Sequence, residues 1–253
     1  MRDQSLQLLG VSRRRLLSPS PLHAHGTLAS GRINALLALN AGKTYLEIGV
    51  ADGTTLEAVR AGDKEGVDPW PVFNTRRLPT GVTFHRTFSD RFFEESARQF
   101  DAVLLDGLHE FGQTYRDLCN ALGHLSSRGF VILDDTVPAD DVSALPNQED
   151  AIQLARQRGL TFPRPWMGDV FRVVHAISIV HPELEYYTYT DGGRHQTVVW
   201  NRYAQTPVSA SAMDDVRLGQ VEFDESWSET LPDWFHPASE AEIVRSFSAF
   251  LGS

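Results

Sequence analysis

Short apolar runs alternate along the chain with segments whose apolar residues recur every three or four positions. Extended apolar runs predict strands at 44–50, 65–70, 82–90, 101–107 and 129–135. Segments with helical periodicity lie between and around them, at 27–40, 54–62, 110–125, 147–159 and 169–180. Two later runs, 184–190 and 195–202, are predicted strands joined by a turn at 191–193.

The clearest helical pattern is at 110–125. Its apolar residues follow one another at intervals of 4, 3, 4 and 3 and are Phe111, Tyr115, Leu118, Leu122 and Leu125. This spacing predicts a helix with one buried stripe. Cys119 adjoins the stripe, so we interpret it as a small packed hydrophobe rather than a reactive thiol.

Strands that alternate with helices and have nearly continuous apolar bodies are typical of a parallel sheet with helices on both faces. The predicted fold class is therefore α/β, with a Rossmann-like doubly wound sheet that is mostly parallel. Only residues 191–194, with the turn at 191–193, separate the last two strands, so these should pair antiparallel at one edge of the sheet.

The chain is predicted to consist of an arm at 1–25, a main domain at 26–203 and a C-terminal extension at 204–253. The arm has a basic flank but too short an apolar run for a signal peptide; a role in covering substrate or contacting a second subunit is the alternative. The extension is acidic and aromatic. It ends in a short helix, for which Ser239 and Glu242 form a capping box. It either covers a cleft or a subunit contact, or docks on its own domain.

Composition narrows the range of partners. The 253 residues are 42% hydrophobic, enough for one sizeable core. A net charge of −10 argues against nucleic acid, and no apolar run approaches the roughly 20 residues of a membrane helix. Cys119 is the only cysteine, which excludes an intrachain disulfide and indicates a reducing compartment, so we expect a cytoplasmic location.

The turn after the first predicted strand carries Glu47, Gly49, Gly53 and Thr54 and leads into a helix. Glycines let the backbone pass close to a ligand, and the start of a helix offers free N–H donors. The spacing is not the G-x-G-x-x-G of dinucleotide sites. A glutamate at the strand end would repel a pyrophosphate and suits a ligand that carries positive charge.

This turn resembles the E/D-x-G-x-x-x-G motif of the class I S-adenosylmethionine-dependent methyltransferases. The resemblance covers most of 27–202 and implies the strand order 3-2-1-4-5-7-6, with 26–203 as the domain that binds S-adenosylmethionine. It also implies that Asp68 holds the ribose hydroxyls and that Ser89 and Asp90 lie on the adenine side. Glu47, Gly49, Gly53, Thr54 and Asp106 would complete the cofactor-binding residues.

Three carboxylates end two consecutive predicted strands. Asp106 ends one of them, and Asp134 and Asp135 end the next. If these strands are neighbours, their ends lie roughly 5 Å apart. Carboxylates at that distance repel one another unless they are protonated or share a cation, and oxygen ligands favour Mg²⁺. The alternative is that each aspartate caps a local turn or helix.

The segments at 104–118 and 125–136 resemble a metal-dependent branch of these methyltransferases that includes sugar O-methyltransferases. That resemblance implies Mg²⁺ on Asp106, Asp134 and Asp135, and His109 as the base. The alternative for His109 is a residue at the helix entry that bonds a nearby carbonyl. A W-x-G-D-V segment begins at Trp166. It fits the same branch, although we expect its Asp169 to cap a helix that begins at Val170.

The predicted function is Mg²⁺-dependent transfer of a methyl group from S-adenosylmethionine to a hydroxyl of a sugar, glycan or glycosylated metabolite. In such a reaction the metal stabilises charge on the acceptor oxygen while His109 takes its proton. One alternative acceptor is a catechol-like phenol. A nicotinamide-dependent oxidoreductase of similar fold is an alternative from another class. A homodimer is a further expectation, because the extension is rich in aromatic residues.

Overall fold

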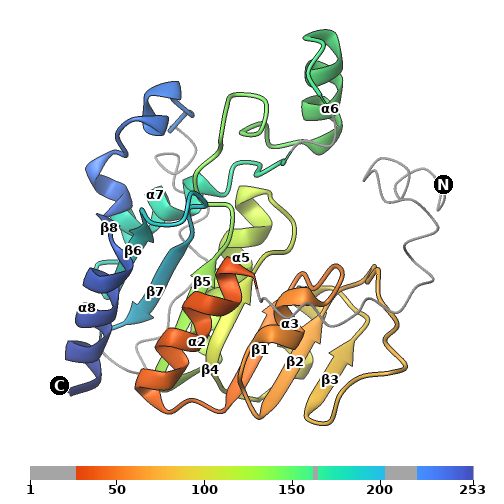
Figure 1. Cartoon of the computed structure of the whole chain (residues 1–253), viewed down its shortest axis with the longest axis vertical. Coiled ribbons are helices and arrows are strands. Elements are labelled where there is room, and N and C mark those ends of the chain that lie inside the picture. Colours follow the sequence, from red (N-terminus) through yellow and green to blue (C-terminus); the bar gives the residue numbers. More distant parts are fainter. Residues whose placement is uncertain (1–26, 162–164, 203–220, 253) are drawn as a thin grey trace.

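The structure, a computed structural model, describes residues 27–161, 165–202 and 221–252. One mixed sheet has the strand order β3-β2-β1-β4-β5-β7-β6-β8 (Figure 1). Its strands are β1 (Thr44–Ile48), β2 (Asp63–Val67), β3 (Val82–His85), β4 (Phe100–Leu105), β5 (Leu125–Leu133), β6 (Leu184–Tyr189), β7 (Thr197–Asn201) and β8 (Pro237–Ala238). The helices are α2 (Leu28–Asn40), α3 (Thr54–Ala58), α4 (Ser89–Glu95), α5 (Phe111–Gly123), α6 (Gln148–Gln157), α7 (Phe171–Val180) and α8 (Glu240–Gly252), with 3₁₀ turns η4 (Glu225–Ser228) and η5 (Asp233–Phe235).

The sheet confirms the predicted α/β class and the predicted order of its first seven strands. Strands β3, β2, β1, β4 and β5 pair in parallel, and β7 pairs antiparallel with both β5 and β6. The predicted antiparallel pairing of β6 with β7 is confirmed, and the short strand β8, which pairs in parallel with β6, extends the sheet by one strand beyond this hairpin. The added strand covers backbone groups of β6 that an edge would leave unpaired.

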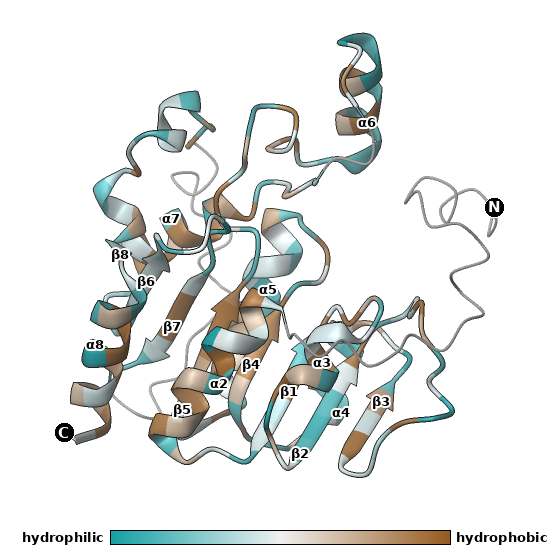
Figure 2. Cartoon of the chain, in the orientation of Figure 1, coloured by the Kyte–Doolittle hydropathy of each residue, from teal (hydrophilic) through white to brown (hydrophobic). Residues whose placement is uncertain are grey.

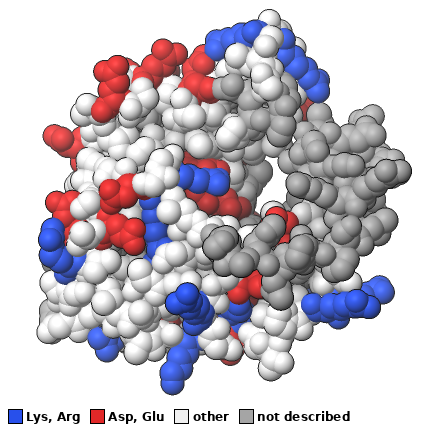
Figure 3. Space-filling view, in the orientation of Figure 1, with Lys and Arg blue, Asp and Glu red and all other residues white. Residues whose placement is uncertain are grey.

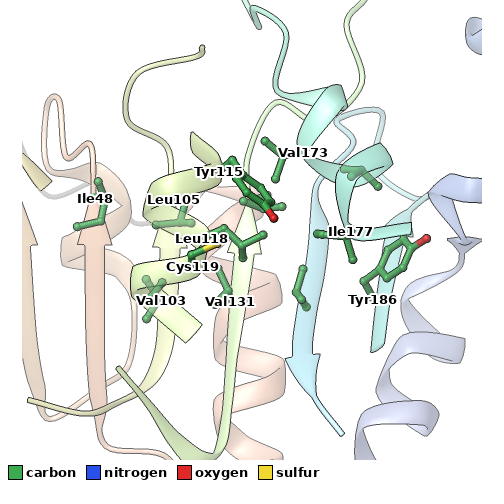
Figure 4. Packing of buried hydrophobic residues seen from close by; sticks show 14 of the residues in the cluster. Ile48, Val103, Leu105, Tyr115, Leu118, Cys119, Val131, Val173, Ile177 and Tyr186 are labelled. Atoms are coloured by element: carbon green, nitrogen blue, oxygen red, sulfur yellow. The ribbon is translucent and has the colours of Figure 1, made fainter. Parts of the chain in front are cut away.

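Helices cover both faces of the sheet. On one face α5 and α7 pack against β4 and β5, as Figure 4 shows for Tyr115 and Val131. On the other face α2 and α8 contribute Leu36 and Phe247 to a second cluster. Hydrophobic residues dominate β5 and much of β4 (Figure 2), as expected for strands buried on both faces.

Strand β2 differs from its neighbours because it carries two buried charged residues, Lys64 and Glu65. The Lys64 ammonium donates to carbonyls at the end of α3, including Leu56 O at 2.6 Å. Glu65 pairs with Arg98, and its Oε2 lies 2.7 Å from His85 Nε2. These partners compensate the cost of removing the charges from water. Because of these partners, β2 can lie inside the sheet although it is coloured hydrophilic in Figure 2.

Several element boundaries differ from the sequence-based prediction. The predicted strand at 82–90 is too long: β3 ends at His85, and Ser89 begins α4, a helix that the pattern did not predict. Strand β5 begins at Leu125 rather than at residue 129, since Leu125 already pairs with Phe100. Helix α7 begins at Phe171, and the prediction that Asp169 caps this helix is wrong. The Asp169 carboxylate instead accepts the N–H of Phe111 at 2.6 Å, so it fixes the start of α5. A partner this distant in sequence is not visible in a local pattern.

The C-terminal segment, over residues 221–252, docks on the domain that precedes it. Trp227, Phe235 and Phe247 are buried there. The predicted capping box is confirmed: Ser239 N donates to Glu242 Oε2 at 2.8 Å, and Glu242 N to Ser239 Oγ at 3.4 Å. The predicted arm at 1–25 and the first part of the extension, up to residue 220, lie outside the described residues.

We expect Phe247→Ala to lower the free energy of unfolding by about 3–5 kcal/mol, the usual cost of truncating a buried phenylalanine. The Phe247 ring is fully buried and lies 5.4 Å from the ring of Phe130 and 5.2 Å from that of Trp200. Urea unfolding measures the loss. Arg245→Ala, at an exposed position of the same helix, is the control and should have little effect. Equal effects of the two variants would show that α8 is not part of the cooperative core.

Within the described ranges, no helix is long and apolar enough to cross a membrane. Figure 3 shows basic side chains scattered among acidic ones on the described part of one face. This distribution agrees with the net charge of −10 and differs from the continuous basic surface that binds a phosphate backbone.

Candidate active site

The central strands β1, β4 and β5 end at the same level. Ile48 pairs with Leu105, and Leu105 pairs with Leu133. The residues that follow these three therefore meet at the carboxyl edge of the sheet, where open α/β sheets bind ligands. The antiparallel pairing of Leu133 with Thr197 also brings the turn before β7 to this edge.

The glycine turn after β1 lies against the end of β4. Gly49 has φ +84°, and a Cβ on it would lie 2.0 Å from the backbone oxygen of Asp106. Gly53 has φ +81°, but its nearest heavy atom would be 3.5 Å away, on Phe73. The first glycine is therefore required by the close approach of two strand ends, and the second only by its backbone conformation.

Gly49→Ala should lower the free energy of unfolding by about 3 kcal/mol or more, because the two strand ends must move apart as well as carry the strain of a left-handed alanine. Gly53→Ala is the matched comparison and should cost about 1 kcal/mol, since only the strain applies. Urea unfolding of both variants measures the difference. Similar losses at the two positions would contradict the close contact of Gly49 with β4.

A pocket of about 310 Å³ opens beside the glycine turn. Of the residues predicted to bind the cofactor, those that line it are Glu47, Gly49, Thr54 and Asp106. Its other lining residues include Thr27 of the α2 cap, Asp134, Arg194 and Gln196. A larger hollow of about 420 Å³ lies between α7, β6 and η5, apart from these residues. The smaller pocket is therefore the one that joins the predicted cofactor residues to the acidic strand ends.

Glu47 is a buried carboxyl group at this pocket. Burial raises its pKa well above the ordinary value, although the hydroxyl of Tyr45 donates to its Oε2 at 2.7 Å and opposes the rise. The nearby carboxyl of Asp106 adds to it. A positively charged ligand group would stabilise the ionised form of Glu47 and lower its pKa again, which agrees with the expectation that this glutamate suits a cationic ligand.

The other predicted cofactor residues lie around the turn rather than on the pocket wall. Asp68 Oδ2 accepts the N–H groups of Val50 at 3.0 Å and Ala51 at 2.9 Å, so it holds the glycine turn. Gln113 Nε2 donates to Ser89 Oγ at 3.2 Å and to Asp90 Oδ1 at 3.1 Å. Their predicted contacts with the ribose and the adenine remain predictions.

The structure brings Asp106, His109 and Asp135 together: each offers one ligand atom, and these atoms lie within 4.8 Å of one another. His109 Nε2 is 3.3 Å from Asp106 Oδ1, and His109 Nδ1 is 3.6 Å from Asp135 Oδ2. Burial raises the pKa of Asp106, and Asp135 adds to the rise while His109 opposes it. Two carboxylates and an imidazole can hold a divalent cation.

The environment of His109 favours its protonated form in the absence of a metal. Its Nδ1 bonds the backbone carbonyl of Trp166 at 2.8 Å, and its Nε2 faces Asp106. Although burial lowers the pKa of His109, the hydrogen bond to Asp106 and the charge of Asp135 raise it to about 9. The residue is therefore both a helix-entry side chain bonded to a carbonyl and a neighbour of the acidic cluster.

Residues 166–169 hold His109 from several directions. The Trp166 ring stacks on the imidazole at a centroid distance of 5.3 Å. A Cβ on Gly168, which has φ +62°, would lie 1.6 Å from the backbone oxygen of His109. Asp169 fixes the N–H of Phe111 two residues later. This segment and the start of α5 consequently form one packed unit.

Asp134, the remaining predicted metal ligand, lies outside the group formed by Asp106, His109 and Asp135. Its Oδ1 accepts the N–H of Asp135 at 2.8 Å and is 3.6 Å from Arg194 Nε. Burial, with the charges of Asp106 and Asp135, raises the pKa of Asp134 to about 6. Asp134 thus holds the backbone N–H of Asp135, whose φ is +53°.

Arg194 and Gln196 are site residues that the sequence analysis missed. Arg194 Nη2 donates to Asp135 Oδ1 at 2.8 Å. Gln196 Oε1 accepts from Arg32 Nη1 at 2.8 Å. The signal that would have found them is the antiparallel pairing of β7 with β5, which sets the residues before β7 beside those after β5.

Comparison with known proteins agrees with this site. A family of methyltransferase domains matches residues 46–136, less than half of the chain but including the predicted site residues from Glu47 to Asp135. No curated protein matches the chain in sequence. The matched segment ends immediately after the acidic pair, so it contains the strand ends that form the site.

Several solved structures share the fold. The O-methyltransferase TomG from Streptomyces achromogenes, involved in tomaymycin synthesis and solved with S-adenosylmethionine, is 17% identical, with a TM-score of 0.51 over 79% of this chain and 90% of that chain. The cofactor-bound protein Rv0187 from MTB is 15% identical, with a TM-score of 0.52 over 78% and 88%. A methyltransferase of Podospora anserina bound to S-adenosylhomocysteine is 12% identical, with a TM-score of 0.51 over 79% and 88%.

At these identities the likeness is one of fold, and the fold is that of the class I methyltransferases. The matched segment is that of a methyltransferase domain, and the fold agrees with this match.

Proposed function

We propose that the protein transfers the methyl group of S-adenosylmethionine to a hydroxyl of a sugar, glycan or glycosylated metabolite, with Mg²⁺ at the acidic cluster. The observation that carries the proposal is the convergence of Asp106, His109 and Asp135 at the strand ends beside the glycine turn. One side of this edge suits a positively charged methyl donor. The other offers a base and carboxylates to an acceptor hydroxyl.

The residues of the pocket would bind the donor through charge and shape. Glu47 is a buried acid without a basic side chain in hydrogen-bond contact among its described partners, and it suits the cationic end of S-adenosylmethionine. Gly49, Val50 and Ala51 of the glycine turn line this pocket. Holding donor and acceptor in line is itself a large part of catalysis, because methyl transfer requires the attacking oxygen, the carbon and the sulfur to align.

His109 has the geometry of a general base. Its Nδ1 is held by the Trp166 carbonyl, so Nε2 is the nitrogen that can take a proton from the acceptor hydroxyl. In the metal-free protein this nitrogen faces Asp106 Oδ1 at 3.3 Å and is protonated, so it would become the base only when Asp106 binds the cation instead. When bound at Asp106 and Asp135, Mg²⁺ would supply stabilisation of negative charge on the acceptor oxygen.

The proposed acceptor class rests on the resemblance in sequence, and one segment that carries this resemblance lies next to the base. Trp166, which begins the W-x-G-D-V segment, stacks on His109, and its indole N–H donates to Leu145 O at 2.6 Å. The ring therefore stands in a fixed position next to the base. The aspartate at position 135, where catechol enzymes usually carry asparagine, favours the sugar branch.

The test offers the purified protein S-adenosylmethionine and a panel of saccharides and catechols, with EDTA or with added Mg²⁺, and follows the gain of one methyl mass. We expect transfer to a saccharide that depends on Mg²⁺. Calorimetric titration with S-adenosylmethionine and NAD is the accompanying measurement. Binding of NAD without S-adenosylmethionine would refute methyl transfer, and transfer only to catechols would refute the acceptor class.

A further inference from the structure

The acidic pair after β5 already contacts a cation that belongs to the chain. Arg194 Nη2 donates to Asp135 Oδ1 at 2.8 Å. Arg194 Nε donates to the same oxygen at 3.2 Å, and it also lies 3.6 Å from Asp134 Oδ1. The Arg194 side chain is 51% exposed, whereas that of Asp135 is 4% exposed. A buried carboxylate thus has as its partner a guanidinium that can reach solvent.

The turn that carries Arg194 is anchored. Arg32 of α2 is buried and stacks on the ring of Tyr189 at 4.1 Å. It donates to the backbone carbonyls of Asp191 and Arg194, the latter at 2.9 Å. The backbone at Arg194 is therefore fixed beside the site, and its contact with Asp135 is not the chance position of a free loop.

The same carboxylate is needed by the metal of the proposed function. Arg194 uses one oxygen of Asp135, while the other faces His109 at 3.6 Å. A guanidinium and a divalent cation on one carboxylate repel each other. The pocket wall that contains Asp106 and Asp134 also contains Arg194, so the repulsion acts across the whole site.

We propose that Arg194 competes with the divalent cation for Asp135, so that metal binding is an exchange in which the guanidinium turns out toward solvent. The proposal rests on the metal site of the proposed function and adds to it a residue that sets the affinity for the cation. Arg194 neutralises the acidic pair in the metal-free protein, which lets the two adjacent carboxylates remain buried.

The experiment is calorimetric titration of Mn²⁺ into chelator-treated full-length protein, without donor or acceptor. Arg194→Gln should bind Mn²⁺ about tenfold more tightly than the wild type, a size expected for losing one partly exposed charged hydrogen bond. The matched control is Arg158→Gln. It removes an arginine from a surface pair with Asp141 at 2.8 Å and should bind as the wild type does.

Thermal unfolding is a second measurement, made once in EDTA and once with added Mn²⁺. The Tm of Arg194→Gln should lie below that of the wild type in EDTA, and added Mn²⁺ should raise it by more than it raises the Tm of the wild type. Equal or weaker binding by Arg194→Gln, with the wild type still binding, overturns the competition and leaves the metal site standing. Absence of Mn²⁺ binding in both proteins overturns the competition together with the metal dependence of the proposed function.

Discussion

Replacing His109 with glutamine should lower kcat for methyl transfer by about 10²–10⁴-fold, the usual contribution of a general base. Binding of S-adenosylmethionine should be nearly unchanged, because His109 is not among the residues that line the pocket beside the glycine turn. Steady-state kinetics and calorimetry measure the two quantities. His236→Gln, an exposed histidine that stacks on Tyr186 at 4.3 Å, is the control and should retain full turnover.

The protonation of His109 gives a readout that a merely structural residue would not produce. In the metal-free protein its pKa of about 9 lies above the ordinary 6.5, so its ion pairs stabilise the fold below pH 6.5, and this contribution is lost as the pH rises through 9. Asp106→Asn should lower the midpoint in an NMR titration of the imidazole. An unchanged midpoint, or full turnover by His109→Gln, would contradict the assigned role.

Asp135→Asn should weaken binding of Mn²⁺ by about 100-fold or more, since it removes a charged oxygen from the group of possible ligands. Asp134→Asn is the matched comparison one residue away. It should weaken binding less, because Asp134 lies outside that group and acts by orienting the N–H of Asp135. Metal titration separates the two variants. An effect at Asp134 as large as that at Asp135 would restore the ligand set that the sequence resemblance implies, with both aspartates as ligands, and would contradict the purely orienting role of Asp134.

Much of the fold is predictable because its causes are local. The stripe that includes Tyr115 and Leu118 predicts α5, and the apolar body of β4 predicts a strand buried on both faces. The capping box at Ser239 predicts the start of α8 for the same reason. Each of these signals depends on residues within one turn of helix or one strand.

The features that the sequence pattern does not predict depend on partners far along the chain. Strand β8 consists of two residues whose only distinction is their pairing with β6. Asp169 has the sequence of a helix cap but bonds a backbone group 58 residues away. Arg194 follows two turn glycines and reaches the acidic pair only because β7 returns antiparallel to β5.

The site residues also fall into those that a local pattern predicts and those that depend on distant parts of the chain. Asp106, Asp134 and Asp135 could be expected at one edge because consecutive parallel strands end together. Which member of the acidic pair lies next to His109 could not be predicted, because it depends on contacts far along the chain and on the left-handed backbone of Asp135, with φ +53°. The sequence pattern therefore locates the cluster, and only the structure shows which side chains make it up.

The packing of residues 166–169 against His109 has a consequence for how the acceptor could change in evolution. The Trp166 carbonyl bonds the imidazole, the Trp166 ring stacks on it, and Gly168 leaves room for the backbone of His109. The hydrogen bond and the close approach depend on the main chain, whose path must be inherited, whereas the ring at Trp166 can be exchanged for another flat side chain and so admit a new acceptor. New specificity and the old proton acceptor can coexist because different parts of the same few residues provide them.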